Sequence, residues 1–427
     1  MPILTLMDRR NRARSLAGPL ALSLLLLALA AGPASAATLR PVGALRVDQV
    51  GTGSIALRWR DRSHRESSYE IAVRLRGEDR WRRSRASRNA HGFRLRGLDR
   101  GRVYEARVRA CKERRCARGR ARQAATLLAP FGGPHPAPGC ASFPASDAFN
   151  RDVSGAPLDP RSNAIIAQIN ADGGDFLHPD FGSNPSYGIP YVVVPPDQPR
   201  VPIRFTAYGG ESDRGPYPIP PGAPIERGRR SDGDRHVLVV RRPRSSGGSC
   251  RLYELYRAFE RGGARNAWSA DSGALFDLGV PLIGQRPAGW TSADAAGLPI
   301  YPGLVTLEEV RSGVIDHAIR ITFDETRRGY LPPATHYASD SCNPDRPPTG
   351  LRLRLRAGYN LAGVSGDARV IATALKRYGV IVADNGSNWF IPGSADRRWN
   401  DANLNQLKEI PGGAFEVVGH GPETSPC

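Results

Sequence analysis

Four histidines in the larger, C-terminal part of the chain stand beside groups that could share their chemistry. His178 is two residues from Asp180, and Asp234 is two residues from His236. Residues two apart lie on one face of an extended strand, so each pair could present an imidazole and a carboxylate together. Such a pair can act as general acid and base, or can supply N and O ligands to a metal ion. The same spacing is also typical of a carboxylate that orients a structural histidine.

The other two histidines are also flanked by polar or aromatic residues. His317 follows Asp316, and His336 lies between Thr335 and Tyr337. We therefore take all four histidines as candidate catalytic residues. No cofactor is evident from a motif, and the question of a divalent metal stays open at this point.

Glu254 is the carboxylate best suited to glycan chemistry. In the run 253–256 the side chains alternate, so we expect Glu254 and Tyr256 on the open face of a sheet and Tyr253 toward the core. An acid beside an aromatic on an open sheet face suits a sugar-cleaving groove. The second acid that a glycosidase needs would be Glu211, Asp213 or Asp234. A solvated sheet face explains the same pattern without chemistry.

Two polar loops add side chains that could bind a sugar. Trp290 and Asp294 share one of them, and Asp384 and Trp389 share the other. Tryptophan rings can stack on sugars, so we predict that these four residues bind substrate. Helix capping by Asp294 and core packing of the tryptophans are the alternatives.

Common catalytic signatures are missing from the sequence. There is no G-x-S-x-G, no phosphate-binding loop, no H-E-x-x-H and no EF-hand loop. These absences argue against common esterases, nucleotide-using enzymes and zincin proteases.

Extended segments dominate the part of the chain that must position these residues. Strands are predicted at 187–194, 201–208, 236–241, 251–258, 317–323, 351–357, 380–384 and 415–418. Helical periodicity occurs at 162–170, 369–378 and 404–409. Strands and helices do not alternate, which disfavours a parallel doubly wound sheet. We predict a mostly β protein whose larger domain, residues 140–418, is a β-rich sandwich or jelly-roll with a few peripheral helices.

Residues 38–127 form a separate module of short alternating runs. Trp59 ends one such run, and Tyr69 lies near the start of another. The turn 98–104 has the sequence Leu-Asp-Arg-Gly-Arg-Val-Tyr. With these residues the module resembles a fibronectin type III domain, and the resemblance implies that Tyr104 is its tyrosine corner. Modules of that family are usually spacers or adhesive units and not catalysts.

Positive charge is concentrated in this module. It holds 25 basic and 9 acidic residues, whereas residues 128–427 hold 31 of each, so the net charge of +19 does not describe the larger domain. The arginines would bind polysaccharide or another anionic cell-envelope polymer. A general preference for arginine at solvated positions explains the same count. No nucleic-acid partner is expected, because an exported protein rarely meets one.

The first 36 residues are typical of an export signal. Four arginines precede the apolar run 20–31, and Ala34-Ser35-Ala36 offers small residues for cleavage. We therefore expect a secreted protein, extracellular or associated with the cell envelope, with no transmembrane segment after cleavage. The alternative is an uncleaved membrane anchor, for which the run is short, because a spanning helix needs about 20 apolar residues. Residues 128–139 are predicted to be a Pro/Gly linker, and 419–427 a tail.

The six cysteines fit an oxidising compartment. Cys111 and Cys116 bracket four residues and are predicted to form a disulfide across a hairpin. Three pairings remain open for the others, Cys140, Cys250, Cys342 and Cys427.

The larger domain also resembles a family of uncharacterised secreted bacterial proteins. The resemblance rests on the runs 177–182, 216–220, 233–236, 252–256, 289–300, 317–320, 334–337 and 383–387. It implies no activity.

Three functions agree with these observations. The first is a glycan-active hydrolase or lyase tethered by the basic module. The second is a carbohydrate-binding or adhesive wall protein without catalysis, and the third is a metal-dependent hydrolase of another ester or amide bond.

Overall fold

A computed structural model describes residues 39–129, 140, 142–262 and 267–427 of the 427-residue chain. The predicted export signal and residues 130–139 of the predicted linker lie outside these ranges. Within the described residues the protein is mostly β, with a few helices in its larger domain, which confirms the predicted fold class.

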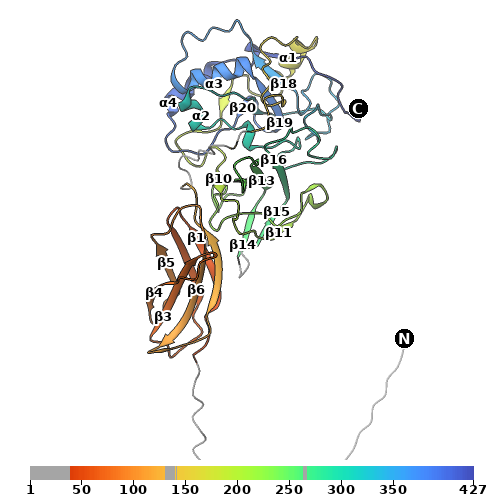
Figure 1. The fold of residues 1–427 in the computed structure, drawn as a ribbon. Coiled ribbons are helices and arrows are strands. Elements are labelled where there is room, and N and C mark those ends of the chain that lie inside the picture. The colour runs from red at the N-terminus through yellow and green to blue at the C-terminus, as the bar shows by residue number, and fades with distance from the viewer. Residues whose placement is uncertain (1–38, 130–139, 141, 263–266) are drawn as a thin grey trace, which may run out of the picture. The chain divides into compact units, whose positions relative to one another are not determined.

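The basic module is a sandwich of two antiparallel sheets (Figure 1). One sheet contains β1 (Gly43–Val50), β2 (Ser54–Arg60) and β5 (Gly92–Arg96). The other contains β3 (Ser68–Leu75), β4 (Arg82–Ser87), β6 (Val103–Lys112), β7 (Arg115–Cys116) and β8 (Arg120–Ala125).

The module has the core of a fibronectin type III-like fold. Trp59 and Tyr69 pack with ring centroids 5.3 Å apart between the sheets. The Tyr104 hydroxyl accepts a hydrogen bond from the Asp99 backbone N–H at 2.9 Å, which is a tyrosine corner. Cys111 and Cys116 form the predicted disulfide.

Two small sheets form one part of the larger domain. The first has the order β10 (Tyr191–Val194), β12 (Val237–Arg241), β13 (Arg251–Tyr256), β16 (Ser272–Asp277), and only its β10–β12 pair is parallel. The second has the order β11 (Ile203–Phe205), β15 (Ala267–Ala270), β14 (Phe259–Gly262).

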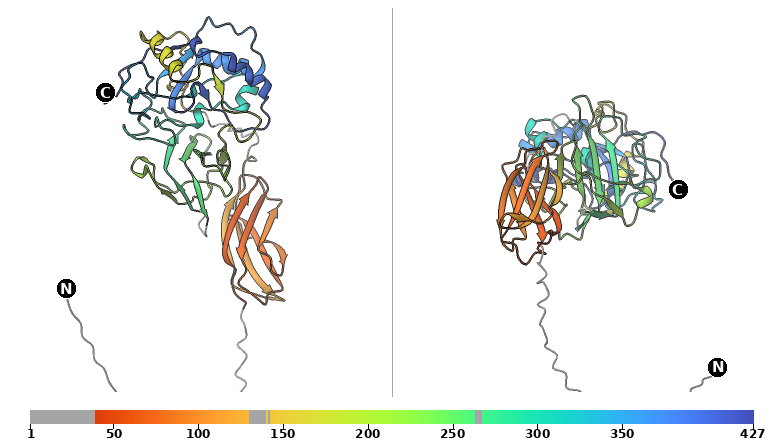
Figure 2. Two further views of the ribbon diagram at one scale, coloured as in Figure 1. Left: turned by 180° about the vertical axis from the view of Figure 1, so that it is seen from behind. Right: turned by 60° about the horizontal axis from the view of Figure 1, so that its bottom comes forward.

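A mixed six-stranded sheet forms the rest of the domain. Its order is β21 (Phe415–Val417), β18 (Arg352–Leu355), β19 (Val380–Asn385), β17 (Ile319–Phe323), β20 (Phe390–Ile391), β9 (His178–Pro179). The helices gather around it, and α3 packs on β18 (Figures 1 and 2). They are α1 (Ser162–Asp172), α2 (Leu307–Ser312), α3 (Gly366–Arg377) and α4 (Asp401–Leu404), which continues into the 3-10 turn Asn405–Glu409.

Both faces of β19 are buried, which explains its continuous apolar sequence. Val380 and Val382 enter one core cluster, and Ile381 and Ala383 enter another. Strict alternation would send Asp384 to the side of Val382. A register shift prevents this, because Ile321 of β17 pairs with Val382 whereas the next residue, Thr322, pairs with Asp384.

Two disulfides complete the domain. Cys140 bonds to Cys250 and Cys342 to Cys427, which selects one of the three open pairings. The C-terminal residues, set apart as a tail in the sequence, are also held by an ion pair between Arg327 and Glu423. No helix in the described part of the chain is both long and apolar enough to cross a bilayer.

Candidate functional site

Several predicted site residues meet in one cavity of about 220 Å³ in the larger domain. We call it the acidic pocket. Its charged lining residues are Asp180, Glu226, Arg227, Asp234, His236, Arg320 and Asp384. They come from the residue after β9, the loop before β12, and the strands β17 and β19.

The register shift in β19 brings Asp384 to the pocket. Thr322, its partner across the strands, lies two residues from Arg320 and therefore on the same face of β17. β-bulges commonly re-aim a side chain beside a functional site. Here the shift places a carboxylate on the face of the sheet that Arg320 already occupies.

Arg320 is held by a buried ion pair. Its Nε and Nη2 donate to the two carboxylate oxygens of Asp294 at 2.7 and 2.6 Å, and Asp294 is fully buried. The Arg320 Nη2 also lies 3.5 Å from Asp384 Oδ2. Among the described residues, Arg320 Nη1 has no hydrogen-bond partner, although this side chain is only 9% exposed and lines the pocket.

Asp384 is a carboxyl group whose pKa lies near neutrality. Burial and the charge of Asp294 raise the pKa to about 7, against the opposing effects of Arg320 and the Asn385 backbone N–H. The Asp384 side chain still has 30% of its surface exposed. It can therefore hold a proton at neutral pH and exchange it with a bound molecule.

Asp180 is the second carboxyl group with a raised pKa in this pocket. Burial is the main cause, and the charge of Glu226 adds to it, whereas Arg227 opposes it. Asp234 is exposed at the rim, and its charge contributes to the raised pKa of Asp384. The pocket thus combines carboxyl groups that favour protonation with one that faces water.

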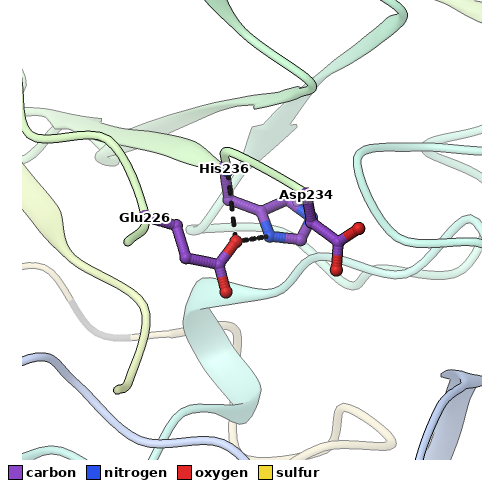
Figure 3. A group of neighbouring side chains, drawn as sticks. All are labelled: Glu226, Asp234 and His236. Atoms are coloured by element: carbon purple, nitrogen blue, oxygen red, sulfur yellow. Dashed lines mark hydrogen bonds and ion pairs between the residues drawn. The ribbon is translucent and has the colours of Figure 1, made fainter. Parts of the chain in front are cut away.

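His236 forms the wall of the pocket as a buried cation. Its Nδ1 lies 2.7 Å from Glu226 Oε2 (Figure 3), and its Nε2 lies 3.1 Å from the Ala293 carbonyl oxygen. Both neighbours are acceptors, so both ring nitrogens donate. Burial opposes the charge, but the Glu226 carboxylate outweighs it and raises the pKa of His236 to about 9. The ring is therefore an imidazolium and not a base at neutral pH.

Glu226, Asp234 and His236 are also the residues that could hold a metal ion. Within the described ranges, their potential ligand atoms lie within 4.8 Å of one another. A metal would have to displace the proton between His236 Nδ1 and Glu226. Figure 3 shows the Asp234 carboxylate turned away from Glu226. His236 and Glu226 form an ion pair, and Asp234 is an acid beside it. The three side chains do not form a closed set of metal ligands.

Glu254 does not lie on an open face of the sheet, so that prediction is wrong. It is 0% exposed, and its carboxylate accepts backbone N–H groups of Ile300 and Tyr301 at 2.9 to 3.1 Å. Both faces of β13 are covered, which the alternation of the sequence does not reveal. Burial raises the pKa of Glu254 to about 7 although these backbone donors lower it.

The remaining histidines lie outside the acidic pocket. The buried His317 directs Nε2 to Glu309 at 3.1 Å and Nδ1 to the Ala318 carbonyl oxygen at 2.9 Å. His336 directs Nδ1 to the Ala295 carbonyl oxygen at 3.1 Å. His178 stacks on Phe390 and lines a neighbouring cavity. Of the four predicted histidines, only His236 lines the pocket itself.

Of the four predicted substrate-binding residues, one lines the acidic pocket and three do not. Asp384 lines the pocket, and Asp294 lies behind it as the partner of Arg320. Trp389 is 0% exposed and packs on Phe323 and Phe415, so it is a core residue and cannot stack on a sugar. Trp290 is partly buried beside Arg286 and does not line the pocket.

Sequence reasoning did not find Glu226 or the role of Arg320. Glu226 lies ten residues before its partner His236, in a stretch rich in proline and glycine without periodicity. Arg320 is the single charged residue of β17, and the other four residues of that strand are apolar or threonine. A lone arginine in such a strand is the one signal that could have marked it.

Comparisons with known proteins concern only part of the chain. Neither a protein-family model nor a curated protein matches it. A fibronectin type III domain of human collagen XX is 26% identical, over 23% of this chain and 100% of that one, with a TM-score of 0.20. A two-domain fibronectin type III segment of chicken tenascin is 22% identical, over 20% of this chain and 49% of that one, with a TM-score of 0.20. The resemblance of the larger domain to uncharacterised secreted proteins stays a prediction.

Proposed function

We propose that the larger domain hydrolyses glycosidic bonds in the acidic pocket. Asp384 is the general acid that protonates the leaving oxygen, and Asp234 is the carboxylate that acts as base or nucleophile. The observation that carries this proposal is the pKa of Asp384, about 7, in a water-accessible pocket that also holds the charge of Asp234. Glycosidases use two carboxyl groups whose surroundings drive their pKa values apart.

The charge of the pocket favours hydrolysis over lyase chemistry. Four carboxyl groups and three cations line it, and two of these cations have acidic partners: Arg320 pairs with Asp294, and His236 pairs with Glu226. A lyase must neutralise the carboxylate of a uronic acid, and these two cations are already neutralised by their own partners. We therefore favour neutral sugars as substrates.

The non-catalytic alternative uses the same aromatic residues and needs no carboxyl groups that converge. Trp389 and Trp268 are 0% and 1% exposed and offer no stacking surface, whereas Trp290 is partly buried. The four carboxyl groups that meet in one pocket are the reason for favouring the enzyme. The basic module, in this proposal, holds the enzyme near an anionic cell-envelope polymer.

The test is release of reducing ends from a panel of neutral polysaccharides and peptidoglycan. Asp384→Asn should lower kcat by about 10²–10⁴-fold, the usual contribution of a general acid. The acid must hold its proton, so wild-type activity should fall as pH rises through about 7. Asp232→Asn, at an exposed acid outside the pocket, is the matched control.

The outcomes separate the roles of the carboxyl groups. Equal activity of wild type and Asp384→Asn would remove Asp384 from the mechanism. If Asp180→Asn alone abolished the alkaline decline, the proton donor would be Asp180. A wild type that releases no reducing ends from any polymer of the panel would contradict the proposed function.

A further inference from the structure

A second cavity, of about 300 Å³, borders the acidic pocket. Asp180 lines both cavities. His178 of the second cavity stacks on Phe390 of the acidic pocket, with ring centroids 4.1 Å apart. The two cavities therefore share a wall formed by Asp180 and this ring pair. We call the second cavity the neighbouring pocket.

The lining of the neighbouring pocket suits a sugar ring. Tyr187 offers an aromatic face, and its side chain is 50% exposed. Asn184, Asn405 and Lys408 bring amide and ammonium groups to the same cavity. Among the described residues, the amide nitrogens of both asparagines and the Lys408 ammonium have no hydrogen-bond partner. An aromatic platform surrounded by free donors is able to bind the apolar face and the hydroxyls of a sugar.

The turn that carries Tyr187 is fixed before any ligand arrives. The Asp401 carboxylate accepts the Ser183 backbone N–H at 2.7 Å and the Ser183 hydroxyl at 2.6 Å. A Cβ on Gly182 would lie 2.6 Å from Asp401 Oδ1, so only glycine allows this close approach. At the other end of the turn, Gly188 has φ +82° and lines the acidic pocket. A rigid turn loses little entropy when a ligand binds.

We propose that the neighbouring pocket binds the sugar unit adjacent to the one held in the acidic pocket. The substrate is then a glycan chain of at least two units, and the bond between them crosses the wall at Asp180. This inference rests on the proposed function. It adds a substrate class and a binding residue, Tyr187, which touches no group of the proposed acid–base machinery.

The test is calorimetric binding to full-length Asp384→Asn protein, which holds substrate without rapid turnover. The probes are cello-, xylo-, chito- and malto-oligosaccharides of one to six units. Affinity should rise from one unit to two. Adding Tyr187→Ala should lower disaccharide affinity roughly tenfold, the equivalent of about 1.4 kcal/mol of aromatic contact, and should remove the gain in affinity from one unit to two. Tyr208→Ala is the matched control, because Tyr208 is also 50% exposed but lines neither cavity.

The outcomes distinguish this inference from the proposed function. If the disaccharide binds no tighter than the monosaccharide, or if Tyr187→Ala behaves like Tyr208→Ala, the neighbouring pocket is not a subsite, whereas hydrolysis by wild type is unaffected by that result. If Tyr187-dependent binding occurs but wild type cleaves none of the probes, the subsite is supported and the hydrolase is not. If no probe binds and none is cleaved, both proposals are wrong.

Discussion

His236 shows how two acceptors decide the charge of a buried ring. Glu226 and the Ala293 carbonyl oxygen face its two nitrogens, so the folded chain stabilises the imidazolium. Its pKa is about 9 in the folded chain, against the ordinary 6.5 expected after unfolding. The folded state therefore binds the proton more tightly than the unfolded state.

Stability should depend on pH through this residue. The stabilisation is fully present below pH 6.5 and is lost as pH rises through about 9. Over that window the free energy of unfolding of the larger domain should fall by up to roughly 3 kcal/mol. Urea denaturation at a series of pH values measures this. His236→Gln should flatten the decline, and His91→Gln, at an exposed histidine of the module, should not. An unchanged slope in His236→Gln would mean that the ring is neutral in the folded protein.

At the scale of elements, the sequence predicts where most strands and helices lie. Predicted strands at 251–258 and 380–384 correspond to β13 and β19, and the predicted helix at 369–378 corresponds to α3. These predictions succeed because the periodicity of apolar residues reports local backbone geometry. In the larger domain, strands β9, β14, β15, β16 and β20 were not predicted. β9 and β20 have only two residues each, and β16 combines glycine and serine with buried positions.

The arrangement of the site could not be predicted in the same way. Asp384 reaches the pocket through a one-residue register shift against β17, and a sequence does not show such a shift. The prediction that Glu254 lies on an open face was wrong for a related reason. Alternation shows which residues share a face of a strand, but it does not show which of the two faces another layer covers. Pairing of distant elements, and not local pattern, decides both cases.

The disulfides should contribute to stability according to the loops that they close. Cys140–Cys250 spans 110 residues and Cys111–Cys116 spans 5. Loop-closure entropy then predicts losses of about 5 and about 2 kcal/mol for the respective double Cys→Ser variants. Thermal unfolding, followed separately for the two domains, measures both. Equal losses from the two variants would show that local geometry and not loop length sets their contributions.

At the scale of the whole molecule, the two folded parts differ in charge. Acidic partners exist for some arginines of the module, as in the Arg74–Glu105 and Arg109–Glu70 ion pairs. However, its 9 acids cannot match 25 basic residues, and on β4 the side chains of Arg82, Arg83 and Arg85 are exposed. Residues 128–427, which contain the larger domain, are neutral in their formal charges. Long-range attraction to a polyanion would therefore come from the module.

Full-length protein should consequently bind a polyanion such as heparin or polyglutamate and be released by salt. Charges on a surface are screened over about 10 Å at 0.1 M salt, so elution should shift strongly with ionic strength. A chain of residues 140–427 should pass through the same column at low salt. Replacing Arg82, Arg83 and Arg85 together with glutamine tests one exposed strand, and should lower the salt concentration of elution without unfolding the module. If the shortened chain elutes with full-length protein, the attraction belongs to the larger domain, and the excess of arginine in the module only keeps its surface solvated.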